Sequence, residues 1–263
     1  MKKNVIRIIL DAAMAVLLIL MYKKTAISLE FHEIGGLVVG GMFLFHNLLN
    51  RKWIVGISRR IFSRSLAPRV RVGYAVNVLL LICVVFIAVS GIMISKTLLT
   101  GISGNVARAT LGHYFFSAVA LMLVGMHIGL HWSFIRTTFA KRLRLPRIVA
   151  RPLGIVCLAA VLIYGGYSMV TSSFSHWLTD PIATMIASGD ETLNAGEGDH
   201  VGKGQGQGQG LGSGAGNGAS SHGGALGVIA TYGSIVAVFA ALTALIEKAL
   251  GKRRRPKLVP QSA

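Results

Sequence analysis

Residues 31–50 read FHEIGGLVVGGMFLFHNLLN, and residues 113–131 read HYFFSAVALMLVGMHIGLH. Both stretches are largely apolar, and each carries a pair of histidines 14 positions apart, His32 and His46 in the first and His113 and His127 in the second, which also ends in His131. Apolar runs of about 20 residues are typical of helices that cross a lipid bilayer. The two stretches therefore predict membrane helices that bear ionisable side chains at a fixed spacing.

The composition of the whole chain also favours a membrane location. Of the 263 residues, 53% are hydrophobic and only 14% are charged, whereas soluble domains have about 25% charged residues. The net charge of +18 does not indicate a nucleic-acid-binding protein, because the basic residues lie between apolar runs and not in one patch among polar and aromatic residues. We expect an all-α integral membrane protein.

Six segments are long and apolar enough to predict membrane crossings. They are residues 4–22, 33–50, 74–95, 111–135, 150–171 and 225–247. The first follows basic residues as a signal peptide would, but its apolar run is long and no small-residue cleavage site follows. We therefore interpret it as a membrane helix that is kept.

The basic residues predict how these six helices are oriented. If the N-terminus is cytoplasmic, 22 of the 27 Lys and Arg residues fall on the cytoplasmic side, within 2–7, 51–71, 136–151 and 248–257. Cytoplasmic loops carry an excess of Lys and Arg in membrane proteins. The sequence therefore predicts a multi-pass protein of the bacterial cytoplasmic (inner) membrane with both termini in the cytoplasm.

The chain divides into two predicted parts. Residues 1–140 are expected to form a four-helix core, and residues 141–263 add two further helices joined by a Gly-rich extracytoplasmic loop at about 189–224. A tract of Gly, Gln and Ser has little to bury, so we expect a linker there. We interpret residues 174–200, ahead of that tract, as a short interfacial segment followed by a solvated acidic loop.

The histidine spacing places each pair on one helix face. Fourteen residues turn about 1400°, about 40° short of four turns, and rise about 21 Å. Helices 33–50 and 111–135 run in the same direction under the predicted topology, so His32 is level with His113, and His46 with His127. The sequence thus predicts two histidine pairs at two depths of the membrane.

Paired neutral imidazoles on facing helices are suitable axial ligands for haem iron. We therefore predict two non-covalent b haems, with His32 and His113 holding the outer iron and His46 and His127 the inner one. A single membrane histidine is explained by an interhelical hydrogen bond, but four in register are costly and indicate a functional site. The sequence has no CxxCH motif for a covalent c-type haem.

Small residues share the faces that carry these histidines. Gly36 and Gly40 lie near His32 on the helical wheel, and Ser117 and Ala120 lie near His113. Small residues let a macrocycle approach the backbone, although they also serve ordinary helix packing in membranes. We include all four among the candidate haem-binding residues because they accompany the matched histidines.

Two further ionisable residues have open interpretations. His131 follows His113 by 18 residues, on the same face, and it could replace His127 as ligand, contact a haem propionate, adjoin a quinone, or lie with Trp132 in an interfacial belt. Asp11 is either an intramembrane proton carrier or an acid favoured by the helix dipole. A zinc hydrolase is not expected, because His32-Glu33 lacks the second histidine of HExxH at Gly36.

These segments resemble the flavinylation-associated cytochrome family over roughly residues 8–135. The resemblance rests on a set of residues in three segments: His32, Glu33, His46, Asn50, Trp53, Asn77, Ser90, Gly91, His113, His127, His131 and Trp132. It implies a transmembrane electron conduit that receives electrons from the quinone pool or a cytoplasmic donor. The implied acceptor is an extracytoplasmic flavoprotein with covalently bound flavin, and this chain itself has no evident flavin domain.

Two other functions are compatible with parts of the sequence. One is a haem-containing membrane anchor of a quinone-linked respiratory dehydrogenase or reductase. The other is a transporter or scaffold without haem, whose histidines relay protons or bind a metal. Transporters usually show internal repeats, and neither half of this sequence convincingly repeats the other. Electron transfer through two bis-histidine haems is the function we expect.

Overall fold

The computed structural model describes residues 2–23, 28–98, 105–143, 146–194 and 224–253. Over these ranges the chain forms eight helices and no strand. The helices are α1 (Lys2–Leu20), α2 (Leu29–Ser58), α3 (Pro68–Met93), α4 (Val106–Leu130), α5 (Trp132–Leu143), α6 (Arg147–Thr171), α7 (Phe174–Asn194) and α8 (Ala225–Arg253). The all-α prediction is confirmed, and the Gly-rich tract predicted as a linker lies outside the described residues.

Four of the described helices are long and apolar enough to cross a membrane. They are α3, α4, Arg151–Thr171 within α6 and Ala225–Leu250 within α8. Large apolar side chains on α6 are widely exposed, among them Ile155 (69%), Ile163 (74%) and Val170 (77%). Such exposure suits contact with lipid better than contact with water. These features indicate a multi-pass membrane protein.

Several predicted boundaries differ from the observed ones. The predicted helix 111–135 is divided at His131, whose backbone (φ −94°, ψ 6°) caps α4 before α5 begins. Residues 174–194, interpreted as a short interfacial segment and a loop, form the 21-residue helix α7. The sequence has no helix-ending proline or glycine at His131 itself. The acidic residues of α7 interrupt the apolar pattern by which a helix would be recognised.

The helix starts are fixed by ordinary capping. The hydroxyl of Ser28 accepts a hydrogen bond from the amide of Phe31 at the start of α2, and the side chain of Asn105 accepts one from Arg108 at the start of α4. Such caps satisfy amides that have no partner inside the helix. Pro68 begins α3, where its missing N–H removes no helical hydrogen bond.

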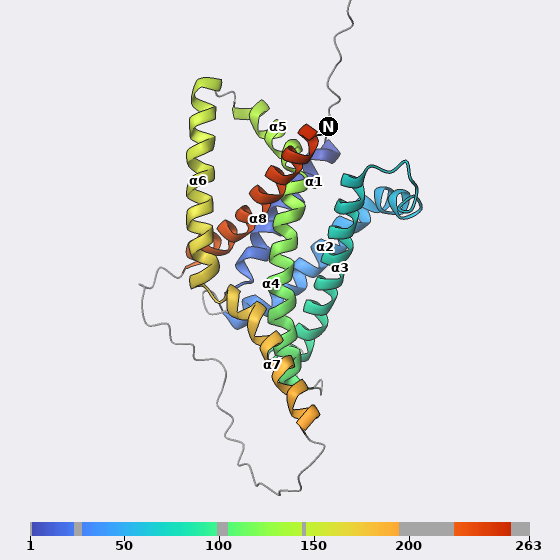
Figure 1. Cartoon of the computed structure of the whole chain (residues 1–263), viewed down its shortest axis with the longest axis vertical. Coiled ribbons are helices and arrows are strands. Elements are labelled where there is room, and N and C mark those ends of the chain that lie inside the picture. The colour runs from blue at the N-terminus through green and yellow to red at the C-terminus, as the bar shows by residue number, and fades with distance from the viewer. Residues whose placement is uncertain (1, 24–27, 99–104, 144–145, 195–223, 254–263) are drawn as a thin grey trace, which may run out of the picture.

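Helix α8 packs with close backbone approach against its neighbours α4 and α6 (Figure 1). A Cβ atom on Gly129 would lie 2.5 Å from the carbonyl oxygen of Ala240, and one on Gly125 would lie 2.7 Å from that of Val236. Gly125 and Gly129 thus form a GxxxG contact that lets two backbones approach each other. A buried cluster that includes Leu121 and Ile235 lies against the same contact.

The basic segments lie at one end of the molecule. Arg7, near the start of α1, donates to the Leu49 carbonyl of α2, and Arg69, near the start of α3, donates to the Leu130 carbonyl of α4. Arg69 also forms a 2.6 Å ion pair with Glu247 of α8. In Figure 1 the start of α1, the end of α8 and α5 all lie at the top. We call this the basic end.

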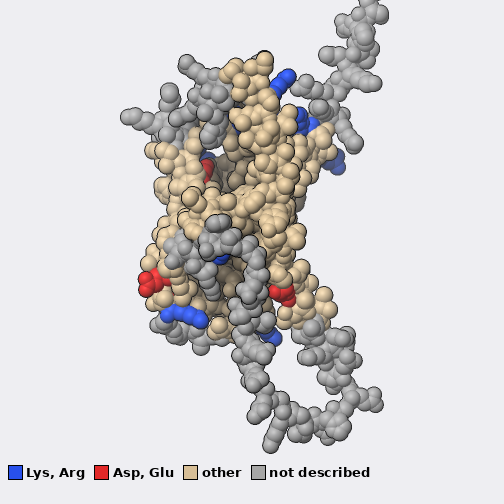
Figure 2. Space-filling model, turned by 90° about the vertical axis from the view of Figure 1, so that its left-hand side faces the viewer, with Lys and Arg blue, Asp and Glu red and all other residues tan. Residues whose placement is uncertain are grey.

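The surface between the two ends is mainly uncharged on the face that Figure 2 shows. Lys and Arg side chains gather toward the two ends of that face, and acidic side chains are few. A band of uncharged side chains between charged ends is the arrangement that a bilayer requires. The uncharged band on this face is consistent with the four helices that are long and apolar enough to cross a membrane.

We expect Gly129→Leu to lower the stability of the protein by about 1–3 kcal/mol, because the new side chain meets the α8 backbone and forces it to move. Gly154→Leu is the matched control, since a Cβ there meets nothing within 4 Å. Thermal unfolding in detergent measures both. Equal midpoints for the two variants would contradict the close packing of α4 on α8.

Candidate functional site

A cavity of about 2790 Å³ lies beside this packed group of helices, and all the predicted site residues line it. Its walls include one residue set from α2 and one from α4: His32, Gly36, Gly40 and His46 on α2, and His113, Ser117, Ala120 and His127 on α4. His131 lines it as well. Pockets for one small molecule usually measure about 300–1,000 Å³, so this cavity is large enough for more than one such ligand.

The cavity separates α2 from α4. Helix α2 packs chiefly against α1 and α3, whereas α4 packs against α3, α7 and α8. A Cβ atom on Gly36 or Gly40 would meet nothing within 4 Å. Gly36 and Gly40 therefore border open space on the cavity side of α2.

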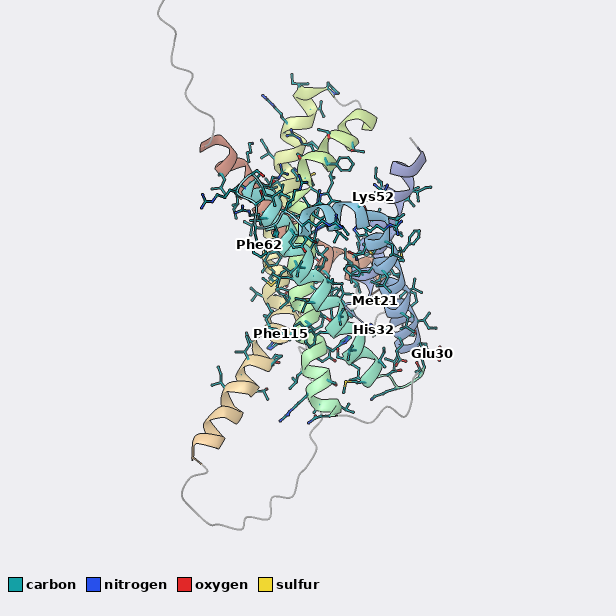
Figure 3. All side chains as sticks on the ribbon, turned by 90° about the vertical axis from the view of Figure 1, so that its right-hand side faces the viewer. Met21, Glu30, His32, Lys52, Phe62 and Phe115 are labelled. Carbon is teal, nitrogen blue, oxygen red and sulfur yellow. The ribbon has the colours of Figure 1, made fainter. Side chains whose placement is uncertain are left out.

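Figure 3 shows how α2 spans the two levels of the site. Lys52 lies toward the basic end, whereas His32, Glu30 and Met21 lie toward the opposite end. We call the level of His32 the distal level and the level of His46 the basic-end level. Both levels open into the one cavity.

At the distal level, His32 and His113 come together from α2 and α4. Their ring centroids are 6.2 Å apart. In a bis-histidine site, metal–nitrogen bonds of about 2 Å and about 1 Å from nitrogen to ring centre give centroids about 6 Å apart. The ring separation fits one metal ion between the two imidazoles.

The ring of His113 is held by helix α3. Its Nδ1–H donates to the carbonyl of Ile87 at 3.2 Å, and Nδ1 also lies 3.1 Å from the hydroxyl oxygen of Ser90. A Cβ on Gly91 would lie 3.4 Å from the ring. A proton on Nδ1 makes Nε2 the basic nitrogen, which is the arrangement of a metal-ligating histidine.

At the basic-end level, His46 and His127 are also oriented through Nδ1, His46 by helix α1 and His127 by helix α3. His46 Nδ1–H donates to the carboxylate of Asp11 on α1 at 2.6 Å, and His127 Nδ1–H donates to the amide oxygen of Asn77 on α3 at 2.7 Å. Helices α1 to α4 thus each contribute a residue to this level.

His131 lies next to this level. Its ring centroid is 4.8 Å from that of His127, and its backbone caps α4. An acceptor on a neighbouring helix orients His127, as metal-ligating histidines require. The hydrogen bond from His127 to Asn77 therefore favours His127 as the ligand and His131 as its neighbour.

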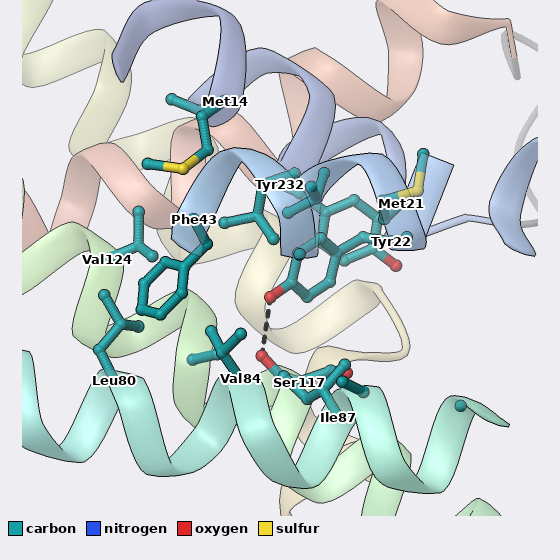
Figure 4. A pocket seen from close by; sticks show the side chains of 18 of the residues that line it. Met14, Met21, Tyr22, Phe43, Leu80, Val84, Ile87, Ser117, Val124 and Tyr232 are labelled. Carbon is teal, nitrogen blue, oxygen red and sulfur yellow. Dashed lines mark hydrogen bonds between the residues drawn. The ribbon is translucent and has the colours of Figure 1, made fainter. Parts of the chain in front are cut away.

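Apolar side chains fill the wall between the two levels. Figure 4 shows Met14, Phe43, Leu80, Val84 and Val124 around one part of the pocket. They come from α1 to α4, and all line the cavity. An apolar wall keeps water away from a bound macrocycle and lowers the local dielectric constant.

An aromatic cluster closes the distal part of the cavity. The Tyr22 hydroxyl donates to the Ser117 carbonyl at 2.8 Å (Figure 4). Trp177 of α7 stacks on Tyr114 at 5.7 Å and on Tyr232 at 5.7 Å. This cluster is not evident from the sequence, because its members lie far apart in the chain and Trp177 belongs to a helix that was not predicted.

The structure also gives Asp11 and Glu33 specific partners. Asp11 lies more than two turns into α1, beyond the first turn where the helix dipole acts, and it contacts His46. The carboxylate of Glu33 accepts hydrogen bonds at the end of α3 from Ser95, Lys96, Thr97 and Leu98. Glu33 therefore ties α2 to α3, and Asp11 belongs to the site.

Two other kinds of side chain could take part in chemistry, namely those that could bind other metals and the two cysteines. No group of three or more His, Cys, Asp or Glu side chains able to hold a metal ion occurs in the described residues, but a haem takes only two protein ligands. Cys83 and Cys157 carry free thiols.

Comparison with protein-family models, curated proteins and solved structures gives no match. The resemblance to flavinylation-associated cytochromes therefore remains a prediction from the residues named above.

We expect Gly36→Leu to reduce binding of the haem predicted from the sequence without lowering the stability of the haem-free protein, because the side chain enters the cavity and meets no protein atom at its Cβ. Gly154→Leu, outside the cavity, should retain the wild-type content. The haem-to-protein ratio from absorbance and the unfolding temperature are the two measurements. Full cofactor content in Gly36→Leu would show that the cofactor does not use this face.

Proposed function

We propose that this protein is a six-span membrane cytochrome that transfers electrons across the bilayer through two bis-histidine b haems. The carrying observation is the position of His32 and His113 on opposite walls of one large cavity, with ring centroids 6.2 Å apart. His46 and His127 line the same cavity at the basic-end level, and each ring is oriented through Nδ1 by a neighbouring helix. When bound, the haems supply reversible one-electron chemistry.

The protein residues have distinct parts in this function. Four histidines hold the two irons, with His32 and His113 at the distal level and His46 and His127 at the basic-end level. Ile87 and Asn77 fix the tautomers of His113 and His127 through acceptor oxygens. Gly36, Gly40, Ser117 and Ala120 leave room on the cavity walls.

We also propose that α1 and α2 cross the membrane beside the four more apolar helices. The polar residues His32, Glu33 and His46 lower the hydropathy of α2, but each has a place against another helix or in the cavity. Polar residues inside a membrane protein usually face the bundle interior in this manner. Six crossings bring the four basic segments to the same side, in agreement with their common end in the structure.

The proposed direction of the bundle places the basic end in the cytoplasm of a bacterium. Electrons then enter from the quinone pool or a cytoplasmic donor and leave at the distal level. The acceptor implied by the family resemblance is an extracytoplasmic flavoprotein with covalently bound flavin.

We expect single substitutions of the four histidines to divide by level. His32→Ala and His113→Ala should remove or spoil one haem, and His46→Ala and His127→Ala the other, because the two levels on one helix are about 21 Å apart. His131→Ala should retain two low-spin haems. Low-temperature difference spectra with redox titration distinguish these results.

The wild-type spectrum provides the control for this series. Absence of a Soret band and a reducible α-band in the wild-type protein would overturn the proposed function. If His131→Ala loses the basic-end haem and His127→Ala does not, the wild-type protein still binds two haems, but the ligand at the basic-end level is His131 and not His127.

We expect a reporter fused after Ala263 to be active only in the cytoplasm, because the end of α8 shares the basic end with the start of α1. Paired fusions of a phosphatase that is active outside and a fluorescent protein that is active inside give the measurement. Activity of the phosphatase alone would reverse the topology and exchange the inner and outer assignments.

A further inference from the structure

The two levels of the site differ in the charge that faces their histidines. At the basic-end level His46 donates to the carboxylate of Asp11 at 2.6 Å. At the distal level His113 donates to a neutral backbone carbonyl, that of Ile87, at 3.2 Å. His127 donates to the neutral amide of Asn77. Among these described contacts, a full negative charge acts directly on His46 alone.

The other charged groups near the two levels have partners of their own, among them Arg69, which pairs with Glu247 at 2.6 Å. Arg7 lies one turn before Asp11 on α1, and its guanidinium donates to the Leu49 carbonyl at 3.0 Å. Glu33 follows His32 in the sequence, but its carboxylate is held by donors of Ser95 and Lys96 at the end of α3. The negative charge of Asp11 is directed at His46, and that of Glu33 is directed at a helix end.

A carboxylate at Nδ1 changes what the histidine gives to a metal. A charge-assisted hydrogen bond is stronger than a neutral one, and it draws the Nδ1 proton away from the ring. The ring then becomes a more basic ligand through Nε2. More electron donation and a nearby negative charge both favour the ferric over the ferrous state, because hydrogen bonds and net charge set reduction potentials.

We propose that Asp11 is a positioning residue that lowers the reduction potential of the haem held by His46 below that of the haem held by His32 and His113. This inference rests on the proposed function and adds a direction to it. With haems held by these histidines, one electron would pass from the haem of His46, which becomes oxidised, to the haem of His32 and His113, which becomes reduced. A quinol or a reduced cytoplasmic donor at the basic end would supply the replacement electron.

The location of Asp11 supports a role beyond structure. An acid within a membrane helix is costly and usually marks a functional site. The carboxylate lines the cavity, and it contacts one of the four histidines that the site requires. A helix-packing role alone does not need a charge there.

The test is a redox titration of the full-length protein in detergent, with Asp11→Asn, Asp11→Glu and the matched control Ser90→Ala. His46→Ala identifies the basic-end component by its loss. That component should have the lower midpoint potential in the wild-type protein. Asp11→Asn keeps an acceptor oxygen but removes the charge, and it should raise this midpoint by a tenfold change in the equilibrium constant or more, which is about 59 mV for one electron.

The other variants separate charge from shape. Asp11→Glu should leave the basic-end midpoint nearer to the wild-type value than Asp11→Asn does. Ser90→Ala, which alters the surroundings of His113, should move only the distal component. If Asp11→Asn loses the basic-end haem, retention of that haem at the wild-type midpoint in Asp11→Glu still supports a requirement for charge.

Four results overturn the inference. They are an unshifted basic-end midpoint in Asp11→Asn, an equal shift in Asp11→Glu, loss of the basic-end haem in both variants, and a basic-end midpoint above the distal one in the wild-type protein. The proposed function fails in a different way, which is the absence of two bound haems from the wild-type protein.

Discussion

An ionisable side chain in the hydrocarbon layer must have a partner, and this constraint organises the helical bundle. An unpaired acid or base at the centre of a membrane helix costs about 2.5–3.5 kcal/mol on insertion scales. Here Asp11 is paired with His46, His127 with Asn77, and His113 with the Ile87 carbonyl. Each of these contacts joins two different helices, so the polar residues of the site also fix how α1 to α4 are arranged.

A second constraint acts on the other side of α4. Gly125 and Gly129 bring α4 against α8, and Gly165 brings α6 against the same helix. The lack of side chains on this side allows close backbone contact, whereas Gly36 and Gly40 on α2 face open space. The same residue type therefore serves two purposes, which only the three-dimensional structure distinguishes.

Much of the fold follows from apolar length and charge. The apolar runs predicted the helices that contain the four spans, and the 14-residue histidine spacing predicted that His32 would meet His113. The break at His131 and the helix α7 were not predicted, because no proline or glycine occupies the capping position of the break, and because Pro181 and acidic residues interrupt the α7 pattern. Tertiary contacts determine both.

The acceptors of the histidines were beyond sequence reasoning for a different reason. The residues that orient His46 and His113 lie 35 and 26 positions away in the chain. No spacing rule connects them, and a backbone carbonyl such as that of Ile87 leaves no mark in the sequence. In the sequence Asp11 is recognisable only as an acid within an apolar run. Its partner His46 is evident only in the structure, where α1 and α2 lie side by side.

The gap between α2 and α4 has a consequence for biogenesis. Helices α3, α4, α6 and α8 are joined by direct packing, whereas the cavity separates α2 from α4, and α1 reaches the α4 cluster only near Tyr22. The hairpin of α1 and α2 should therefore be the last part of the protein to become rigid.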